Sequence, residues 1–276
     1  MPQRIKHPVF ARFYANLAAP ALQKAGVAEH RRKLLSGLSG EVIEIGAGNG
    51  LNFPHYPPEV KRVVAVEPEP RLRALAGEQA RGAPVPVTVQ DARAEQLPYP
   101  DDTFDAAVVC LTLCSVADQH TAPGGVVRVP HGTRGARHAP SPHRPKAQVT
   151  PLRGPSSGTP RARTEHRGHR TGLSQHPLAE LHRILRPGGQ LRFFEHVQAG
   201  SPAMRRVQRV LDATVWPRLM GGCHTGRDTQ AAIVAAGFTV TGVDRFPFPA
   251  TRVPSPAATH ILGTAERPHP GGPDDH

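Results

Sequence analysis

The chain contains 276 residues, which is enough for one α/β domain with a substantial buried core. Its 34 Lys and Arg residues exceed its 22 Asp and Glu residues, and the resulting formal charge of +12 could indicate nucleic-acid or membrane binding. Ten basic residues and a single acid fall between residues 119 and 176, so the remaining chain is only about +3, and a basic surface over the whole protein is excluded.

The first informative element is a short apolar strand followed by a glycine-rich loop. Residues 41–45 alternate as a buried strand does, and glycines follow at positions 46, 48 and 50. Glycine is needed where the backbone adopts positive φ or approaches a ligand closely. A dinucleotide-binding loop would require a further glycine where Leu51 stands, so the Gly-x-Gly-x-Gly spacing indicates another nucleoside-like ligand.

A second strand, predicted over residues 61–66, ends in an acidic residue. Glu67 follows it directly, 21 residues after Gly46, where a carboxylate can accept hydrogen bonds from both hydroxyls of a bound ribose. The alternative for Glu67 is a solvated charge at a strand end. Glu44 lies inside the first strand, where burial is costly, so we expect it to hold amides of the glycine loop and to act on the ligand indirectly.

The next segment resembles a known family. Residues 85–91 predict a third strand, residues 94–105 match the Ala-Glu-x-Leu-Pro to Phe-Asp run of type-11 and ubiquinone-pathway methyltransferases, and a fourth strand is expected from residue 105. These are class I enzymes that use S-adenosylmethionine (AdoMet), and the Gly-x-Gly-x-Gly spacing is typical of them. With the strand-end acid, three motifs therefore occur in the expected order.

The resemblance implies an AdoMet site. It assigns to that site Glu44, Gly46, Ala47, Gly48, Gly50, Glu67, Pro68, Ala94, Glu95 and Cys110. Within this set the backbone of Ala94 and the side chain of Glu95 are expected beside the adenine, with Asp91 as a rival for that position.

Residues 119–176 interrupt the family pattern. They contain eight Pro, eight Gly and seven of the 16 His residues but no aromatic residue other than histidine, a composition that predicts disorder. Three interpretations are open: a basic tether for nucleic acid, a tolerated surface insertion, or a stretch translated from a shifted frame of GC-rich DNA. Its histidines are irregularly spaced and lack Cys or acidic companions, so no metal site is expected.

The remaining chain predicts the second half of an α/β sheet. Its expected elements are a helix over 177–186, a strand over 189–197, a helix over 204–215, a helix over 229–236 capped by Asp228, and strands over 238–243 and 259–265. In the helix over 204–215, five apolar residues recur at three- and four-residue steps and the arginines are expected on the wet face.

Five further segments resemble one subgroup. They are residues 7–14, 49–56, 113–116, 194–197 and 221–224, which together are similar to bacterial relatives of the methyltransferase-like thiol S-methyltransferases.

The subgroup implies residues on the acceptor side. Tyr14 would close the site from an N-terminal lid helix, Cys114 and Cys223 would contact the substrate, and His196 or His224 could assist deprotonation of a thiol. Each has a structural alternative: a histidine that holds a loop carbonyl, or a cysteine that packs as a small apolar side chain.

These observations predict a Rossmann-like α/β fold with a seven-stranded, mostly parallel sheet whose last strand is antiparallel. The expected divisions are lid helices over 1–39, an AdoMet-binding half over 40–118, the insertion over 119–176, a second half over 177–265 and a disordered tail over 266–276.

The expected function is AdoMet-dependent methyl transfer to a small molecule, which could be a thiol. The alternatives are a quinone-pathway C-methyltransferase and a non-catalytic protein whose basic insert binds nucleic acid. No obligatory nucleic acid is expected, and the sequence does not indicate an oligomeric state.

Three features of the sequence predict a cytoplasmic protein. Its three unpaired cysteines lack Cys-x-x-Cys spacing. It contains no apolar run near the roughly 18 residues of a membrane span and no signal peptide.

Overall fold

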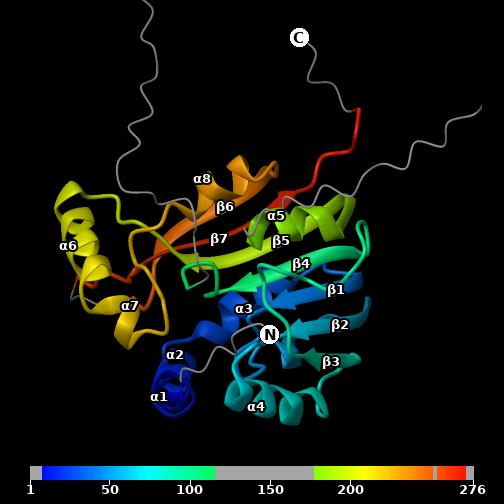
Figure 1. Cartoon of the computed structure of the whole chain (residues 1–276), viewed down its shortest axis with the longest axis horizontal. Helices are drawn as coiled ribbons and strands as arrows, with labels where there is room; N and C mark the ends of the chain where they lie inside the picture. Colours follow the sequence, from blue (N-terminus) through cyan, green and yellow to red (C-terminus); the bar gives the residue numbers. More distant parts are fainter. Residues whose placement is uncertain (1–7, 116–176, 251–253, 272–276) are drawn as a thin grey trace, which may run out of the picture. The chain divides into compact units, whose positions relative to one another are not determined.

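The fold was analysed in a computed structural model that describes residues 8–115, 177–250 and 254–271 (Figure 1). These residues belong to one compact unit. The predicted insertion over 119–176 lies outside the described residues. None of the described helices combines the length and the apolar character that a membrane crossing requires.

A seven-stranded sheet forms the centre of this unit (Figure 1). The strands are β1 (Gly40–Ile45), β2 (Val60–Val66), β3 (Val87–Gln90), β4 (Phe104–Cys110), β5 (Leu185–His196), β6 (Thr239–Pro247) and β7 (Thr259–Glu266). Their order is β3-β2-β1-β4-β5-β7-β6, and only β7 runs antiparallel to its neighbours. The predicted fold class is confirmed.

Helices and helical turns connect the strands. They are α1 (Pro8–Phe13), η1 (Tyr14–Ala18), α2 (Ala19–Lys24), α3 (Val27–Leu35), η2 (Phe53–His55), α4 (Pro70–Ala80), α5 (Pro177–Ile184), α6 (Pro202–Ala213), α7 (Trp216–Leu219) and α8 (Thr229–Ala235). Asp228 caps α8 by accepting a hydrogen bond from the amide of Ala231 at 3.1 Å, as the sequence predicts.

Alternation along the strands divides the core between the two sheet faces. Ile43 and Ile45 of β1 pack into one cluster with Leu181 of α5, whereas Val42 packs into a second cluster with Leu34 of α3. A period of two places alternate residues on opposite faces, so both faces of the central strand are apolar. Each fully buried aliphatic side chain contributes about 1.5–3 kcal/mol.

The start of β5 differs from the prediction. The strand begins at Leu185, immediately after α5, and its register shifts so that Phe104 pairs with Leu185 while Ala106 pairs with Gln190. The Pro-Gly-Gly turn at 187–189 therefore forms a bulge inside the strand, because proline cannot donate to a ladder and glycine tolerates the positive φ of +77° at residue 188.

The second difference concerns α6. Val207 and Val210, expected on its buried face, expose 45% and 63% of their surface, and the one buried residue of the helix is Gln208.

The third difference concerns the tail, which begins later than predicted. Glu266 pairs with Gln190 in the sheet, and the amide of Arg267 donates to the carbonyl of Gly189 at 2.9 Å.

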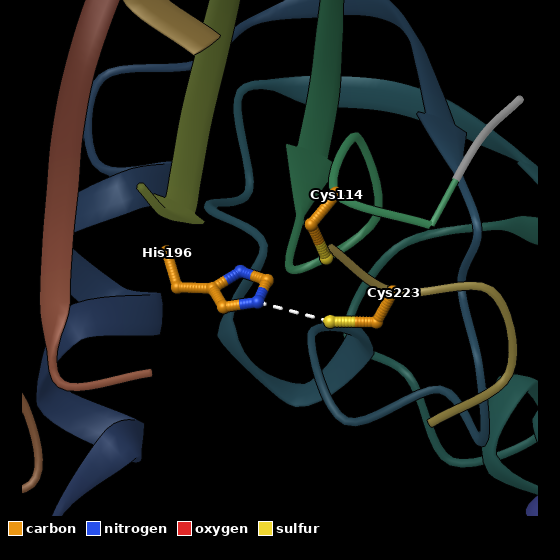
Figure 2. A group of neighbouring side chains, drawn as sticks. All are labelled: Cys114, His196 and Cys223. Carbon is orange, nitrogen blue, oxygen red and sulfur yellow. Dashed lines mark hydrogen bonds between the residues drawn. The ribbon is translucent and has the colours of Figure 1, made fainter. Parts of the chain in front are cut away.

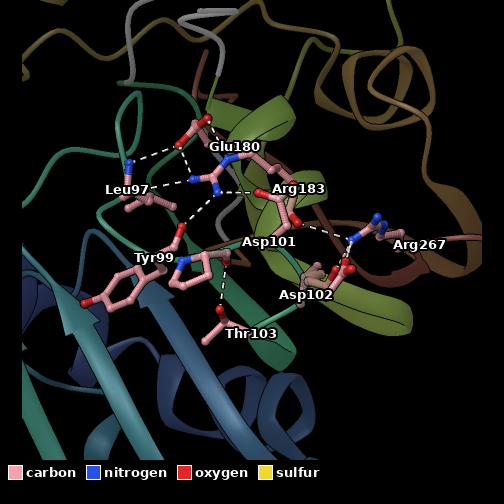
Figure 3. Close-up of polar contacts among 10 residues, drawn as sticks. Leu97, Tyr99, Asp101, Asp102, Thr103, Glu180, Arg183 and Arg267 are labelled. Carbon is pink, nitrogen blue, oxygen red and sulfur yellow. Dashed lines mark hydrogen bonds and ion pairs between the residues drawn. The ribbon is translucent and has the colours of Figure 1, made fainter. Parts of the chain in front are cut away.

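An ionic cluster fastens the loop after β3 to α5 (Figure 3). The guanidinium of Arg183 donates to the carbonyls of Leu97 at 3.1 Å and Tyr99 at 2.8 Å, and it pairs with Asp101 and Glu180 at 2.8 and 2.9 Å. Glu180 also accepts the amide of Leu97 at 3.0 Å. These bonds hold in place the loop that follows residues 94–95.

Candidate functional site

The glycine loop lies at the carboxyl edge of the sheet, between β1 and the helical turn η2. Gly46 has φ of +65°, and a Cβ there would lie 2.4 Å from Cγ2 of Thr112. A Cβ on Gly50, whose φ is +80°, would lie 2.8 Å from the ring of Phe53. Both positions therefore require glycine, for backbone conformation and for space.

A cavity of about 340 Å³ opens beside this loop. Eight of the residues predicted for the site line it: Tyr14, Gly46, Gly48, Glu67, Pro68, Ala94, Glu95 and Cys110. Seven others do not: Glu44, Ala47, Gly50, Cys114, His196, Cys223 and His224. Their direct contact with a ligand remains a prediction.

Glu67 is the polar centre of the cavity's cofactor side. Its side chain is 6% exposed and accepts the amides of Gly48 at 2.8 Å and Glu69 at 2.9 Å. Burial raises the pKa of Glu67 to about 7, although these two amide hydrogen bonds lower it. A carboxylate oxygen accepts more than one hydrogen bond, so Glu67 retains capacity for two hydroxyls of a ribose.

Glu44 has partners other than those predicted. It accepts hydrogen bonds from the side chains of Asn52 at 2.8 Å and Tyr56 at 2.7 Å, and from none of the loop amides of the described chain. Burial raises the pKa of Glu44 to about 7. The expectation of amide contacts is wrong because the amides of Gly46 and Ala47 donate to the Val66 carbonyl and the amide of Gly48 donates to Glu67. Glu44 is held instead by the two side chains that follow the loop.

Arg31 of α3 completes this buried network and was missed from the sequence. Its Nη1 donates to Asn52 Oδ1 at 2.6 Å and to the sulfur of Cys110 at 3.4 Å, while its side chain is almost fully buried. A basic residue in an amphipathic helix is normally solvated, so its spacing carried no signal. The network links the glycine loop, β1 and β4 from behind the cavity.

The adenine side is formed by the segment after β3. Ala94 and Glu95 line the cavity as the family resemblance implies. Asp91, the rival, has a half-exposed side chain, pairs with Arg73 at 3.0 Å and does not line the cavity. The geometry therefore favours Ala94 and Glu95 over Asp91.

The opposite side of the cavity is formed by the lid helices and by two loops. Phe10, Tyr14, Ser115, Gly221 and Gly222 line it. A Cβ on Gly221 would lie 2.7 Å from the Phe10 ring, so this glycine permits the lid to pack against the loop after α7. Burial raises the pKa of the Tyr14 phenol, and the nearby Arg31 charge lowers it.

Behind this wall, three predicted residues meet (Figure 2). The Nε2 atom of His196 lies 3.0 Å from the sulfur of Cys223, and Cys114 places its sulfur beside them from the loop after β4. Burial lowers the pKa of His196 to about 4, so the imidazole is neutral near pH 7. His224 is directed elsewhere, with Nδ1 2.9 Å from the carbonyl oxygen of Gly222.

Glu195, the last residue but one of β5, was also missed as a determinant of the site. It is fully buried and accepts the amides of Thr112 at 2.8 Å and Leu113 at 3.1 Å. Burial raises the pKa of Glu195 to about 7. A carboxylate that ends a strand at the functional edge of the sheet was the available signal, and its role is to fix the loop after β4.

The residues present fit an AdoMet-like ligand. The cradle at Gly46 and Gly48 has no Cβ, Glu67 offers a buried acceptor to hydroxyl groups, and the walls between them are largely apolar. An apolar cavity with a few fixed polar groups is the usual form of a nucleoside site. Gly46, Gly48, Glu67, Ala94 and Glu95 would hold the cofactor.

Comparison with known proteins agrees with this geometry. A profile described as a methyltransferase domain matches residues 43–132. Thiol S-methyltransferase TMT1B of Rattus norvegicus is 29% identical over 242 residues, which cover 84% of this chain and 74% of that protein. Ubiquinone/menaquinone biosynthesis C-methyltransferase UbiE of Geobacter sulfurreducens is 27% identical over 95 residues, covering 33% and 37%.

A solved structure supports the fold. N-methyltransferase NodS of Bradyrhizobium japonicum, in complex with S-adenosylhomocysteine, aligns with a TM-score of 0.51 at 16% identity and covers 94% of this chain and 91% of its own. The glycine loop, the acid at the end of β2, the strand order and the similar proteins all indicate the same kind of enzyme. The chain is a class I S-adenosylmethionine-dependent methyltransferase, and S-adenosylmethionine is its cofactor.

Proposed function

We propose that this enzyme transfers the methyl group to the sulfur of a small-molecule thiol. The observation that carries the proposal is the chemistry of the acceptor side of the cavity. Of the described residues that line it there, none is a carboxylate, a lysine or a histidine. The available polar groups are the hydroxyls of Tyr14, Thr112 and Ser115 and the thiol of Cys110.

Such a wall suits a nucleophile that ionises without a strong base. A free thiol has a pKa of about 8.5, so a few per cent is thiolate at neutral pH, and thiolates are intrinsically strong nucleophiles. An amine with a pKa of about 10 or an alcohol would require proton removal by a positioned side chain. The cofactor supplies an electrophilic methyl group on a positively charged sulfur.

The protein's contribution is then to position the thiol and to exclude water. Phe10 and Leu111 offer apolar surface beside the cavity, which would hold an organic thiol and keep it desolvated. The carboxylates of the lining, at residues 67, 69 and 95, belong to the cofactor side. The name of the TMT1B relative, a thiol S-methyltransferase, supports the same acceptor class.

The assignment of His196 or His224 as the base remains a prediction. Neither side chain lines the cavity, and His196 is occupied by Cys223 at 3.0 Å. On the present proposal the thiol loses its proton to water, and neither histidine is needed for that step.

A matched set of acceptors tests the proposal. Benzyl mercaptan, benzylamine and benzyl alcohol share one scaffold and differ in the nucleophilic atom. We expect mass spectrometry to detect the methyl thioether only, and a Glu67→Ala variant should form much less of it at a limiting concentration of cofactor. Preferential methylation of the amine or the alcohol would overturn the thiol assignment while leaving the methyltransferase intact.

The quinone-pathway alternative is favoured by the UbiE similarity, which covers one third of this chain. A demethylated quinol belongs in the same assay, and its C-methylation at a rate above that of the thiol would favour this second function.

Nucleic-acid binding by residues 119–176 is a prediction on residues outside the described chain. Its test is a steep salt dependence of RNA binding that disappears on deletion of 121–176.

A further inference from the structure

We propose that Cys114, His196 and Cys223 form a binding site for one Zn²⁺ ion. No metal is expected here from the sequence, because these residues lie in three separate segments and show no ligand spacing. The structure brings them together from the loop after β4, the end of β5 and the loop after α7 (Figure 2). The inference does not depend on which acceptor the enzyme methylates.

The distances suit a single ion. One potential ligand atom from each residue lies within 4.8 Å of the other two, and Nε2 of His196 is 3.0 Å from the sulfur of Cys223. Ligand atoms of a tetrahedral zinc site, with bonds of roughly 2.0–2.3 Å, are separated by comparable distances. Figure 2 shows the imidazole and both sulfurs directed toward a common point.

The competing contacts of the three side chains are long: the sulfur of Cys114 lies 3.7 Å from the Leu111 carbonyl oxygen and 3.5 Å from the Ser115 hydroxyl. Nδ1 of His196 is buried and makes no hydrogen bond within the described chain, so the polar contact of this ring is the one with Cys223. Cys114 and His196 are at least nine-tenths buried, which protects a bound ion from exchange. The site is therefore formed in advance by the fold.

A neighbouring donor supports the sulfur of Cys223. The indole Nε1 of Trp216 lies 3.3 Å from it and donates to it. An N–H directed at a metal-bound thiolate is a common outer-sphere contact that orients the ligand. The same contact gives an ordinary apolar cysteine little benefit, because a neutral thiol is a weak acceptor.

The donor set selects the ion. Two thiolates and one imidazole suit Zn²⁺, whereas Mg²⁺ and Ca²⁺ require oxygen ligands. On binding, the two thiols release their protons to solvent and form two zinc–sulfur bonds, while neutral His196 donates a lone pair. The fourth position remains for a water molecule.

The position of the site suggests its effect. Cys114 precedes Ser115 and Cys223 follows Gly222, and both of those neighbours line the cavity. One bound ion would therefore join the two loops of the acceptor wall from behind. Metal loading should stabilise the wall and leave the cofactor side unchanged.

Cobalt substitution tests the site on the full chain. The protein is reduced with a phosphine, stripped of metal and titrated with Co²⁺, whose thiolate complexes show charge-transfer absorption in the near ultraviolet. We expect this absorption to saturate at one ion per chain. Histidines between residues 119 and 176 could also bind cobalt, but they would not produce a thiolate band.

Three variants complete the test. Cys114→Ser and Cys223→Ser should each weaken Co²⁺ binding more than about a hundredfold, because removal of outer contacts alone costs about 10–100-fold. Cys110→Ser is the matched control and should keep the thiolate band. Circular dichroism establishes that each variant is folded.

Two results would overturn the proposal. One is Co²⁺ binding to the reduced, folded protein without the charge-transfer band. This result counts against the proposal even where the cysteines had formed a disulfide before they were reduced. The other is equal weakening by Cys110→Ser and Cys223→Ser. Neither depends on thiol methylation, so this proposal and the proposed function can fail separately.

Discussion

The N-terminal part of the described chain (residues 8–115) and its C-terminal part (residues 177–250 and 254–271) are stabilised differently. Behind the glycine loop, Arg31, Glu44 and Asn52 form a buried polar network that ties helix, strand and loop together. In the C-terminal part, α6 buries one residue, Gln208, and leaves Val207 and Val210 exposed.

This difference matches the two recognition tasks. A cofactor shared by a whole family is bound by strand ends and a loop that a buried network preorganises, whereas the acceptor wall consists of loops and short helices. The network should therefore be costly to change, and the exposed residues of α6 should tolerate substitution.

The largest effect is expected for Arg31→Ala. Loss of the guanidinium leaves Oδ1 of Asn52 without its buried donor and removes the positive charge that favours ionised Glu44, so the free energy of unfolding should fall by about 3–5 kcal/mol in urea titrations. The adjacent and exposed Arg32 provides the control, because Arg32→Ala should change it by less than about 0.5 kcal/mol. Equal effects of the two variants would contradict a special role for the network.

The second largest effect concerns Glu67→Ala. Two charge-assisted hydrogen bonds to ribose hydroxyls would be lost, so calorimetry should show affinity for S-adenosylhomocysteine at least about a hundredfold weaker. Asp91→Ala, the rival carboxylate with a half-exposed side chain, should change it less than about threefold. The reverse ranking would move the ribose site away from Glu67.

Gly46→Ala should cost about 2 kcal/mol of stability. The φ of +65° alone disfavours alanine by about 1–2 kcal/mol, and the added Cβ meets Thr112. Gly77 of α4 has open space around its Cα, and Gly77→Ala should stabilise the helix by about 0.5–1 kcal/mol. Opposite signs for two identical substitutions, measured by urea unfolding, are the expected result.

In the C-terminal part, Gln208→Ala should lower the free energy of unfolding by about 1–2 kcal/mol. The Gln208 side chain accepts the amide of Ala199 at 2.8 Å and donates to the carbonyls of Thr225 at 2.9 Å and Pro256 at 2.7 Å, which the variant leaves unpaired. Its exposed neighbour gives the comparison, since Arg209→Ala should be nearly neutral in the same unfolding experiment. A neutral Gln208 variant would show that α6 is held by other contacts.

The smallest effect is a pH dependence of cofactor binding. Burial raises the pKa of Glu67 to about 7, and only the ionised form offers both oxygens as acceptors. Affinity for S-adenosylhomocysteine should therefore rise with pH and level off above about 7, with a roughly fivefold loss between pH 7 and pH 6. Glu67→Gln should bind weakly with no such slope; a parallel slope would assign the titration to another group.

The sequence predicted the sheet and the cofactor side because both depend on local patterns. A strand, three glycines and a carboxylate at fixed spacing identify one sheet edge, and Gly46 and Glu67 lie there. The bulge at residues 187–189 was not predicted, since Pro-Gly-Gly is an equally good signal for a turn before a strand.

Long-range side-chain contacts were beyond prediction. Arg31 reaches Asn52 across 21 residues, and Cys114 meets Cys223 only because the fold brings the loops after β4 and α7 together. The apolar residues of α6 recur at helical spacing, which predicts a helix. The spacing does not show whether another part of the protein covers the apolar face of that helix.

The loop after β4 has one more consequence, for engineering. Glu195 holds the amides of Thr112 and Leu113, Arg227 donates to the Leu113 carbonyl at 2.6 Å, and the amide of His224 donates to Cys114 at 2.9 Å. These bonds end the cavity wall at a fixed point. We therefore expect a reporter domain spliced between Ser115 and Pro177 to leave the loop after β4 in place.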